Sequence, residues 1–157
     1  MQTVAIFVDV QNIYYTTKQA YQRHFNYQAF WQQATAGREV IKAVAYAIDK
    51  GDSKQQGFQK ALNTIGFEIK LKPYIQRSDG SAKGDWDVGI TLDVIELAAC
   101  ADVIILLSGD GDFDLLLNKI KQTTATQTEV YGVAALTAQS LINAADRFIA
   151  ITPSLLL

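Results

Sequence analysis

Short apolar runs alternate along the chain with longer amphipathic segments. The runs are brief and rich in β-branched and aromatic side chains, so they predict strands at residues 4–8, 40–48, 102–107, 130–133 and 148–151. Residues 67–72 alternate apolar and charged side chains, which is typical of an edge strand with one wetter face. The spacing of apolar side chains elsewhere predicts helices at residues 12–24, 26–36, 54–65, 87–99, 112–122 and 137–145. Residues 76–86 form a polar Gly/Ser/Asp-rich stretch that predicts a loop.

Strands that alternate with helices predict an α/β fold, in which helices cover both faces of a mainly parallel central sheet. This is a three-layer α/β/α arrangement. The runs at 4–8 and 102–107 are almost wholly apolar and should be the central strands. A length of 157 residues fits a single domain spanning 1–157.

Composition narrows the class of protein. Hydrophobic residues make up 49% of the chain and charged residues 19%, which is typical of a globular protein. No apolar run approaches the roughly 20 residues of a membrane span, and the N-terminus lacks the basic segment of a signal peptide. We therefore expect a cytoplasmic protein without a membrane partner. Cys100, the one cysteine, lies in an apolar stretch and is predicted to be a buried structural thiol.

The charges are distributed unevenly. Residues 1–83 hold 11 Lys/Arg and 6 Asp/Glu, whereas residues 84–157 hold 3 Lys/Arg and 10 Asp/Glu. An acidic catalytic half facing a basic substrate-binding half would give this distribution, and so would unrelated solvated helix faces. The net charge of −2 does not by itself indicate a nucleic-acid-binding protein.

The segment Ser108-Gly109-Asp110-Gly111-Asp112-Phe113 joins the predicted strand 102–107 to the next helix. In parallel sheets this edge is where ligands bind. Carboxylates that meet there repel one another unless a cation or a proton lies between them. A helix cap needs only one Asp, and Asp110, Asp112 and Asp114 exceed that need. The segment therefore favours a metal site.

Two further acidic positions are expected at the same edge. Asp9 follows the strand 4–8, and Asp87 begins the helix 87–99. Asp93 lies six residues beyond Asp87, about 240° further round the helix. We therefore expect only one of Asp87 and Asp93 to bind a metal directly.

The segments Phe7–Ile13, Lys83–Asp93 and Leu106–Phe113 together resemble the NYN domain, a PIN-like nuclease family, and in particular its LabA-like bacterial branch. The resemblance covers essentially the whole chain in the right order. It implies a PIN-like, Rossmann-like fold and a metal-dependent ribonuclease, in which clustered carboxylates hold Mg²⁺ or Mn²⁺ and the metal activates water. The implied partner is RNA, expected to be single-stranded.

The resemblance also implies roles for individual residues. It gives the metal ligands as Asp9, Asp93, Asp110 and Asp112, with Asp87 as a fifth catalytic carboxylate. The implied substrate-binding residues are Asn12, Lys83 and Ser108. Asp85 departs from the family pattern and leaves the choice between Asp85 and Asp87 open.

Other residues near these motifs admit two interpretations. Trp86 could stack on a base or anchor its loop to the core, and both remain open. Lys70, Lys72, Arg77 and Lys83 could line a phosphate backbone or be a solvated edge-strand face. The apolar end Leu155-Leu156-Leu157 could dock on its own domain or on a second copy, which would make a homodimer.

Two alternative functions remain. A PIN-like domain that binds RNA or protein without cutting fits the low net positive charge. A haloacid-dehalogenase-like phosphatase would use Asp9, Asp110 and Asp114, but it needs an acid at position 11, where this chain has Gln11. The phosphatase therefore ranks well below the nuclease.

Overall fold

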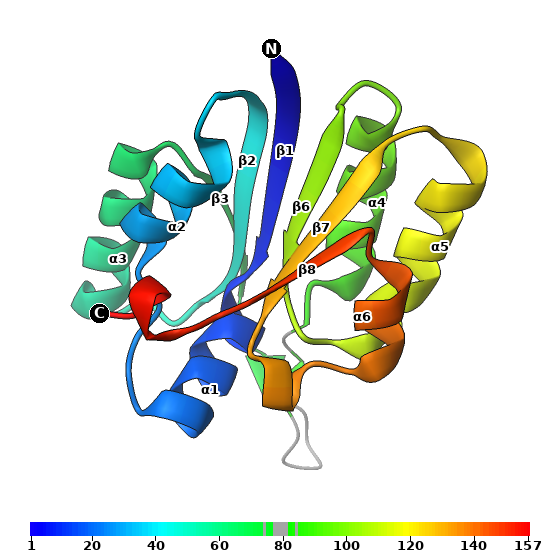
Figure 1. The fold of residues 1–157 in the computed structure, drawn as a ribbon. Coiled ribbons are helices and arrows are strands. Elements are labelled where there is room, and N and C mark those ends of the chain that lie inside the picture. The colour runs from blue at the N-terminus through cyan, green and yellow to red at the C-terminus, as the bar shows by residue number, and fades with distance from the viewer. Residues whose placement is uncertain (74, 77–81, 84) are drawn as a thin grey trace.

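The computed structural model describes residues 1–73, 75–76, 82–83 and 85–157, and of residues 75–76 and 82–83 it describes the backbone. Six parallel strands form the central sheet, in the order β3-β2-β1-β6-β7-β8 (Figure 1). Their bounds are β1 Gln2–Asp9, β2 Arg38–Asp49, β3 Glu68–Pro73, β6 Val103–Leu107, β7 Gln127–Gly132 and β8 Arg147–Ala150. A separate antiparallel pair joins β4 (Ile75–Gln76) and β5 (Ala82–Lys83), within and beside the stretch predicted to be a loop.

Helices cover both faces of this sheet, which confirms the three-layer α/β/α prediction (Figure 1). The helices α2 (Tyr27–Thr35) and α3 (Ser53–Ile65) pack on one face, and α1 (Val10–Tyr21) lies beneath the carboxyl ends of the strands on that side. The other face carries α4 (Asp87–Ala98), α5 (Asp114–Thr123) and α6 (Gln139–Ala144). Short 3₁₀ turns occupy Gly111–Phe113, Ala134–Leu136 and Pro153–Leu155.

The central strands supply both cores. Alternate side chains of β1 point to opposite faces, so Val4, Ile6 and Val8 enter one core while Ala5 and Phe7 enter the other. All of β6 is buried as well. The predictions that these two strands are central and that residues 67–72 form an edge strand are therefore confirmed.

Strand β7 begins three residues before the predicted start at Val130. Its first half is polar, and apolar runs alone do not reveal it. Thr128 is buried, and its N–H and hydroxyl both donate to Asp146, at 2.8 and 3.2 Å. Buried polar residues become tolerable in a strand when such partners are present.

The C-terminal leucines dock on their own chain. Leu155 and Leu156 are buried, and Leu156 forms a β-bridge with Phe25. The Asn26 N–H donates to the Leu155 carbonyl at 2.8 Å, and the Leu157 N–H donates to the His24 carbonyl at 2.8 Å. The sequence left open whether these leucines dock on their own domain or on a second copy. The structure shows them docked on their own domain, although Leu157 stays 68% exposed.

No helix in the part of the chain that the structure describes is both long and apolar enough to cross a membrane.

A bidentate ion pair ties distant strands at the amino edge of the sheet. The Arg38 guanidinium, at the start of β2, donates to both carboxylate oxygens of Glu129 in β7, at 3.0 and 2.7 Å. It also donates to the Ala34 carbonyl and to the Gln2 side chain. The Glu129 side chain is only 9% exposed, and a carboxylate at such a site depends on its partner.

We therefore expect Arg38→Met to lower the free energy of unfolding by about 3 kcal/mol, because it leaves the Glu129 carboxylate buried and unpaired. Urea denaturation at pH 7 measures this. The matched control is Lys42→Met, which removes the half-exposed Lys42–Glu68 pair and should cost at most about 1 kcal/mol. Equal losses in the two variants would contradict the role given to the Arg38–Glu129 pair.

Candidate active site

The strand order reverses between β1 and β6. From β1 the sheet extends to β2 and β3 on one side, and to β6, β7 and β8 on the other (Figure 1). In open α/β sheets such a switch point leaves a crevice outside the carboxyl ends of the two strands. Asp9 ends β1, and the segment Ser108–Phe113 follows β6. The fold therefore brings both acidic motifs to one place.

Three carboxylates meet at this edge. One oxygen from each of Asp87, Asp110 and Asp112 lies within 4.8 Å of the others. Asp87 is the first residue of α4, while Asp110 caps the 3₁₀ turn by accepting from the Asp112 N–H at 3.0 Å. Only Asp110 acts as a cap here, so helix capping does not explain the presence of Asp87 and Asp112.

Asp85 does not belong to this group. Its carboxylate accepts from the Asp87 N–H at 3.2 Å, and its side chain is exposed. Of the two residues between which the sequence left the choice open, Asp87 is the one in the cluster. Asp114 also lies outside the three.

Asp9 is joined to the cluster through Ser108. The Asp9 carboxylate, 8% exposed, accepts from the Ser108 hydroxyl at 3.1 Å and caps α1 by accepting from the Asn12 N–H at 3.4 Å. The same Ser108 oxygen accepts from the Asp110 N–H at 3.2 Å. The Asn12 side-chain oxygen accepts from the Gly109 N–H at 2.8 Å. Asn12 and Ser108 therefore hold the turn in place, and their predicted contacts with substrate stay predictions.

Burial and mutual repulsion make ionisation of this site costly. Burial raises the pKa of Asp9 from 3.8 to about 6. Burial, together with the charge of Asp110 and a hydrogen bond to it, raises the pKa of Asp87 to about 7. Near neutral pH the site therefore holds more negative charge than its surroundings balance, and a proton or a cation relieves it.

Asp93 is not brought to the cluster. Its carboxylate accepts from the Lys70 ammonium group of β3 at 2.7 Å and from the Tyr46 hydroxyl of β2 at 2.7 Å. Burial opposes ionisation of Asp93, but these hydrogen bonds outweigh it and lower the pKa. The structure therefore places Asp87 with Asp110 and Asp112, and Asp93 in an ion pair on another side of α4. The metal-ligand role that the family resemblance implies for Asp93 stays a prediction. The expectation that Asp87 and Asp93 point different ways agrees with this placement.

In the structure, Trp86 anchors the start of α4 to strand β2. Its ring N–H donates to the Ala47 carbonyl at 2.9 Å, and its ring lies 5.3 Å from that of Tyr46. The Lys72 ammonium group sits 4.5 Å from the ring centre. These contacts fix the start of α4, and base stacking by Trp86 stays a prediction. The side chains of Arg77 and Lys83 lie outside what the structure describes.

Sequence reasoning missed the segment that backs the acidic turn. A Cβ atom at Gly109 would lie 2.8 Å from the Leu136 carbonyl oxygen, and one at Gly111 would lie 2.8 Å from the Ala138 Cβ. The Ala138 N–H also donates to the Gly109 carbonyl at 3.1 Å. The two glycines are needed because residues 136–138 approach this closely. In the sequence, only the spacing of Gly109 and Gly111 indicated that another segment packs closely against this turn.

Comparison with known proteins gives the family. The model of the NYN domain matches residues 3–152. This chain belongs to the NYN domain family. Over 159 aligned residues it is 31% identical to the low amplitude and bright protein LabA of Synechococcus elongatus, covering 93% of this chain and 82% of that protein. NYN domains are PIN-like and in general nucleases.

Solved structures agree on the fold. A protein of unknown function from Vibrio parahaemolyticus matches with a TM-score of 0.95 at 56% identity, over 99% of this chain and 96% of that one. Ribokinase from Giardia lamblia matches with a TM-score of 0.51 at 12% identity, over 95% of this chain and 57% of that one. The second likeness concerns the α/β fold alone.

The donor set of this NYN domain fits a divalent cation. Three carboxylate oxygens within 4.8 Å of one another are hard ligands of the kind that Mg²⁺ and Mn²⁺ prefer. Burial and the charge of Asp110 raise the pKa of Asp87, and a cation bound beside it would favour its ionised form.

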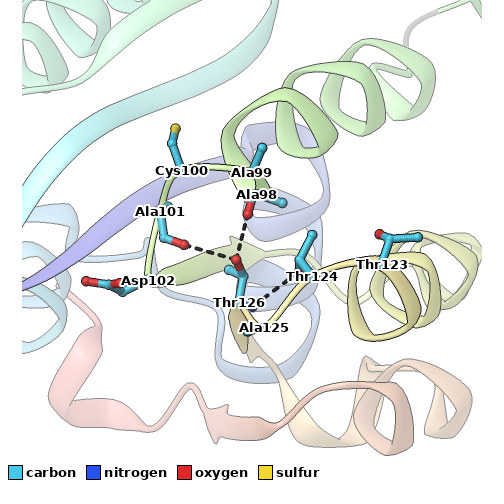
Figure 2. A pocket seen from close by; sticks show the side chains of 9 residues that line it. All are labelled: Ala98, Ala99, Cys100, Ala101, Asp102, Thr123, Thr124, Ala125 and Thr126. Atoms are coloured by element: carbon cyan, nitrogen blue, oxygen red, sulfur yellow. Dashed lines mark hydrogen bonds between the residues drawn. The ribbon is translucent and has the colours of Figure 1, made fainter.

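A hollow at the opposite edge of the sheet differs in character. Figure 2 shows its lining of mostly small side chains from the ends of α4 and α5 and the loops that follow them, residues 98–102 and 123–126. Its one carboxylate, Asp102, accepts from the N–H and hydroxyl of Thr3. Thr126 donates to the carbonyls of Ala98 and Ala101 (Figure 2). Cys100 is exposed here, so the prediction of a buried thiol is wrong. The α4 helix ends before Cys100, which places it on the loop.

The raised pKa of Asp87 predicts how stability depends on pH. Its folded-state pKa lies above the unfolded value, so its contribution is fully present below about pH 4 and is lost as pH rises through about 7. In EDTA, Asp87→Asn should therefore stabilise the protein by about 1 kcal/mol at pH 8, and by less at pH 5, allowing for solvent screening at this partly exposed site.

Urea denaturation of both proteins at the two pH values measures the difference. Asp102→Asn is the matched control, because hydrogen bonds from Thr3 lower the pKa of Asp102 and its loss should destabilise the protein. A gain for Asp87→Asn that is no larger at pH 8 than at pH 5 would contradict the assignment.

Proposed function

We propose that this NYN domain is a metal-dependent ribonuclease that hydrolyses phosphodiester bonds of single-stranded RNA. The observation that carries the proposal is the group Asp87, Asp110 and Asp112 at the switch point of the sheet. Family membership supports nuclease chemistry with RNA as the substrate. Such a substrate also fits the cytoplasmic location that we expect from the sequence, with residues 1–157 acting as one domain.

The three clustered carboxylates would hold Mg²⁺ or Mn²⁺. Such an ion, when bound, lowers the pKa of a water molecule and neutralises charge that develops on the phosphate. Asp112 is exposed and Asp87 is half-buried, so a polyanion can approach the cluster from solvent.

The remaining residues of the site position these ligands. Asp9 and Ser108 link the end of β1 to the Asp110 backbone, and Asn12 holds the Gly109 N–H. Because Asp9 is almost fully buried, its carboxylate adds negative charge behind the cluster without itself facing solvent. Binding of the cation by Asp9 remains a prediction.

Metal binding is testable without activity. In wild-type protein, Mn²⁺ at about ten times its Kd should add about 1.4 kcal/mol of stability, a rise of roughly 3–6 °C in Tm. Asp110→Asn should remove this rise, since it takes away a ligand and a charge. Asp102→Asn, at the opposite edge, should keep it. Calorimetric titration that shows no binding of Mg²⁺ or Mn²⁺ at millimolar concentration would reject the metal site.

Cleavage tests the proposed activity itself. A labelled mixed-sequence single-stranded RNA should be cut in the presence of Mn²⁺ or Mg²⁺ and remain intact in EDTA. We expect Asp110→Asn to lower the rate by at least about 100-fold, because the cation supplies several kcal/mol of charge stabilisation. Asp102→Asn should retain the wild-type rate.

A parallel single-stranded DNA separates the two kinds of substrate. Metal binding and RNA binding without any cutting would reject the nuclease and favour a PIN-like module that binds RNA.

A further inference from the structure

Helix α4 carries an apolar stripe on the side away from the sheet. Its inner side buries Ile90, Val94 and Ala98. On the outer side, Val88, Leu92 and Ile95 are 71%, 64% and 47% exposed. At about 100° per residue these three side chains lie within some 60° of one another on the helix. Ala99, just beyond the helix, is also exposed and continues the same line.

Such a stripe is unusual for a surface helix, whose outer side is normally polar. Exposed single hydrophobic residues need no explanation, but a contiguous row along a whole helix marks an interaction surface. Leu115, at the start of the neighbouring helix α5, is 76% exposed as well. Helices α4 and α5 lie side by side on this face of the sheet (Figure 1).

The charges around the stripe disfavour phosphate-bearing partners. Helix α4 contains Asp87, Asp93 and Glu96 and has no Lys or Arg. An RNA backbone or an anionic lipid surface would be repelled there. A protein surface that is itself apolar fits better.

The spacing of the stripe suits a second copy of this chain. Residues 88, 92, 95 and 99 are separated by 4, 3 and 4, which is the spacing of a seam between two packed helices. The row is symmetric about the point between Leu92 and Ile95. In an antiparallel pair of α4 helices, Leu92 faces the partner's Ile95 and Val88 faces the partner's Ala99, so larger side chains oppose smaller ones at the ends.

The apolar surface would supply about half of a standard interface, and polar residues around it would have to supply the rest. At about 100 Å² for each large exposed side chain, the stripe and Leu115 supply on the order of 400 Å², half of the ~800 Å² that each partner buries in a standard interface. Polar residues of α4 and α5 would form the rim. Glu96 on α4 and Lys119 on α5 are exposed, and neither forms an ion pair within the described residues. In a two-fold interface, Glu96 of one copy could form an ion pair with Lys119 of the other copy.

We propose that the chain forms a two-fold homodimer through the stripe Val88, Leu92, Ile95 and Ala99 of α4, flanked by Leu115 of α5. The two helices run antiparallel, so the two carboxylate clusters lie at opposite ends of the interface. The C-terminal leucines take no part in it.

Sedimentation equilibrium of the full chain over about 1–100 μM tests this. We expect a mass of twice the 17.3 kDa of one chain for the wild type. Ile95→Glu should raise the dimer dissociation constant at least about 100-fold, since it buries an unpaired charge in the seam. Its Tm, measured where the wild type is also monomeric, should fall by only a few degrees, because Ile95 is already 47% exposed in the monomer.

Leu157→Glu is the matched control, with a similar exposed apolar side chain at the C-terminus, and it should remain a dimer. A wild type that is monomeric at 100 μM, or a dimer that Ile95→Glu leaves intact, would overturn the proposal. So would a monomer in which Ile95→Glu weakens RNA binding, which would assign the stripe to RNA.

A cross-link tests the antiparallel register separately. The variant Val88→Cys/Ala99→Cys, with Cys100→Ser to remove the native thiol, should form a covalent dimer on mild oxidation. The variant with Val88→Cys and Cys100→Ser alone should not, because the two copies of residue 88 lie at opposite ends of the seam. Equal cross-linking in both variants would rule out this register.

Discussion

The hydrogen bond from Ser108 to the buried Asp9 carboxylate crosses the point at which the sheet reverses its strand order. Through it, the end of β1 and the turn after β6 become one unit. The same Ser108 oxygen accepts from the Asp110 N–H, so the position of the acidic turn depends on Asp9. Together with the Asn12 side chain and residues 136–138, this link holds the turn against the repulsion among its carboxylates.

The fold opposes that repulsion with geometry. Asp87 enters the cluster as the first residue of α4, where the helix dipole favours negative charge. Residues 136–138 press against Gly109 and Gly111 from behind, so the turn has no room to relax away from Asp87. The cost of the arrangement is visible in the raised pKa values of Asp9 and Asp87. Sites held in this way often trade stability for function.

Helix α4 connects the features of this face of the protein. Its first residue belongs to the carboxylate cluster, and the ion pair of Asp93 with Lys70 and the hydrogen bond of Trp86 to Ala47 fix it to β2 and β3. Its inner side fills the core, and its outer stripe is apolar. Pairing of two such helices would hold the start of α4, and with it Asp87, more firmly than packing on one side alone.

The sequence by itself determined the alternation of strands and helices, the central place of β1 and β6, and the edge at which the acidic motifs gather. These features follow from local periodicity and from the rule that parallel strands share their carboxyl edge. The tertiary structure decided which carboxylates meet. Asp87 and Asp93 lie on one helix, and only the seating of α4 against β2 and β3 directs Asp93 to Tyr46 and Lys70. It likewise decided that Cys100 is exposed and that the C-terminal leucines dock beside Phe25. The seating of Asp93 and the docking of the leucines depend on contacts between residues far apart in the chain, which local sequence patterns do not reveal.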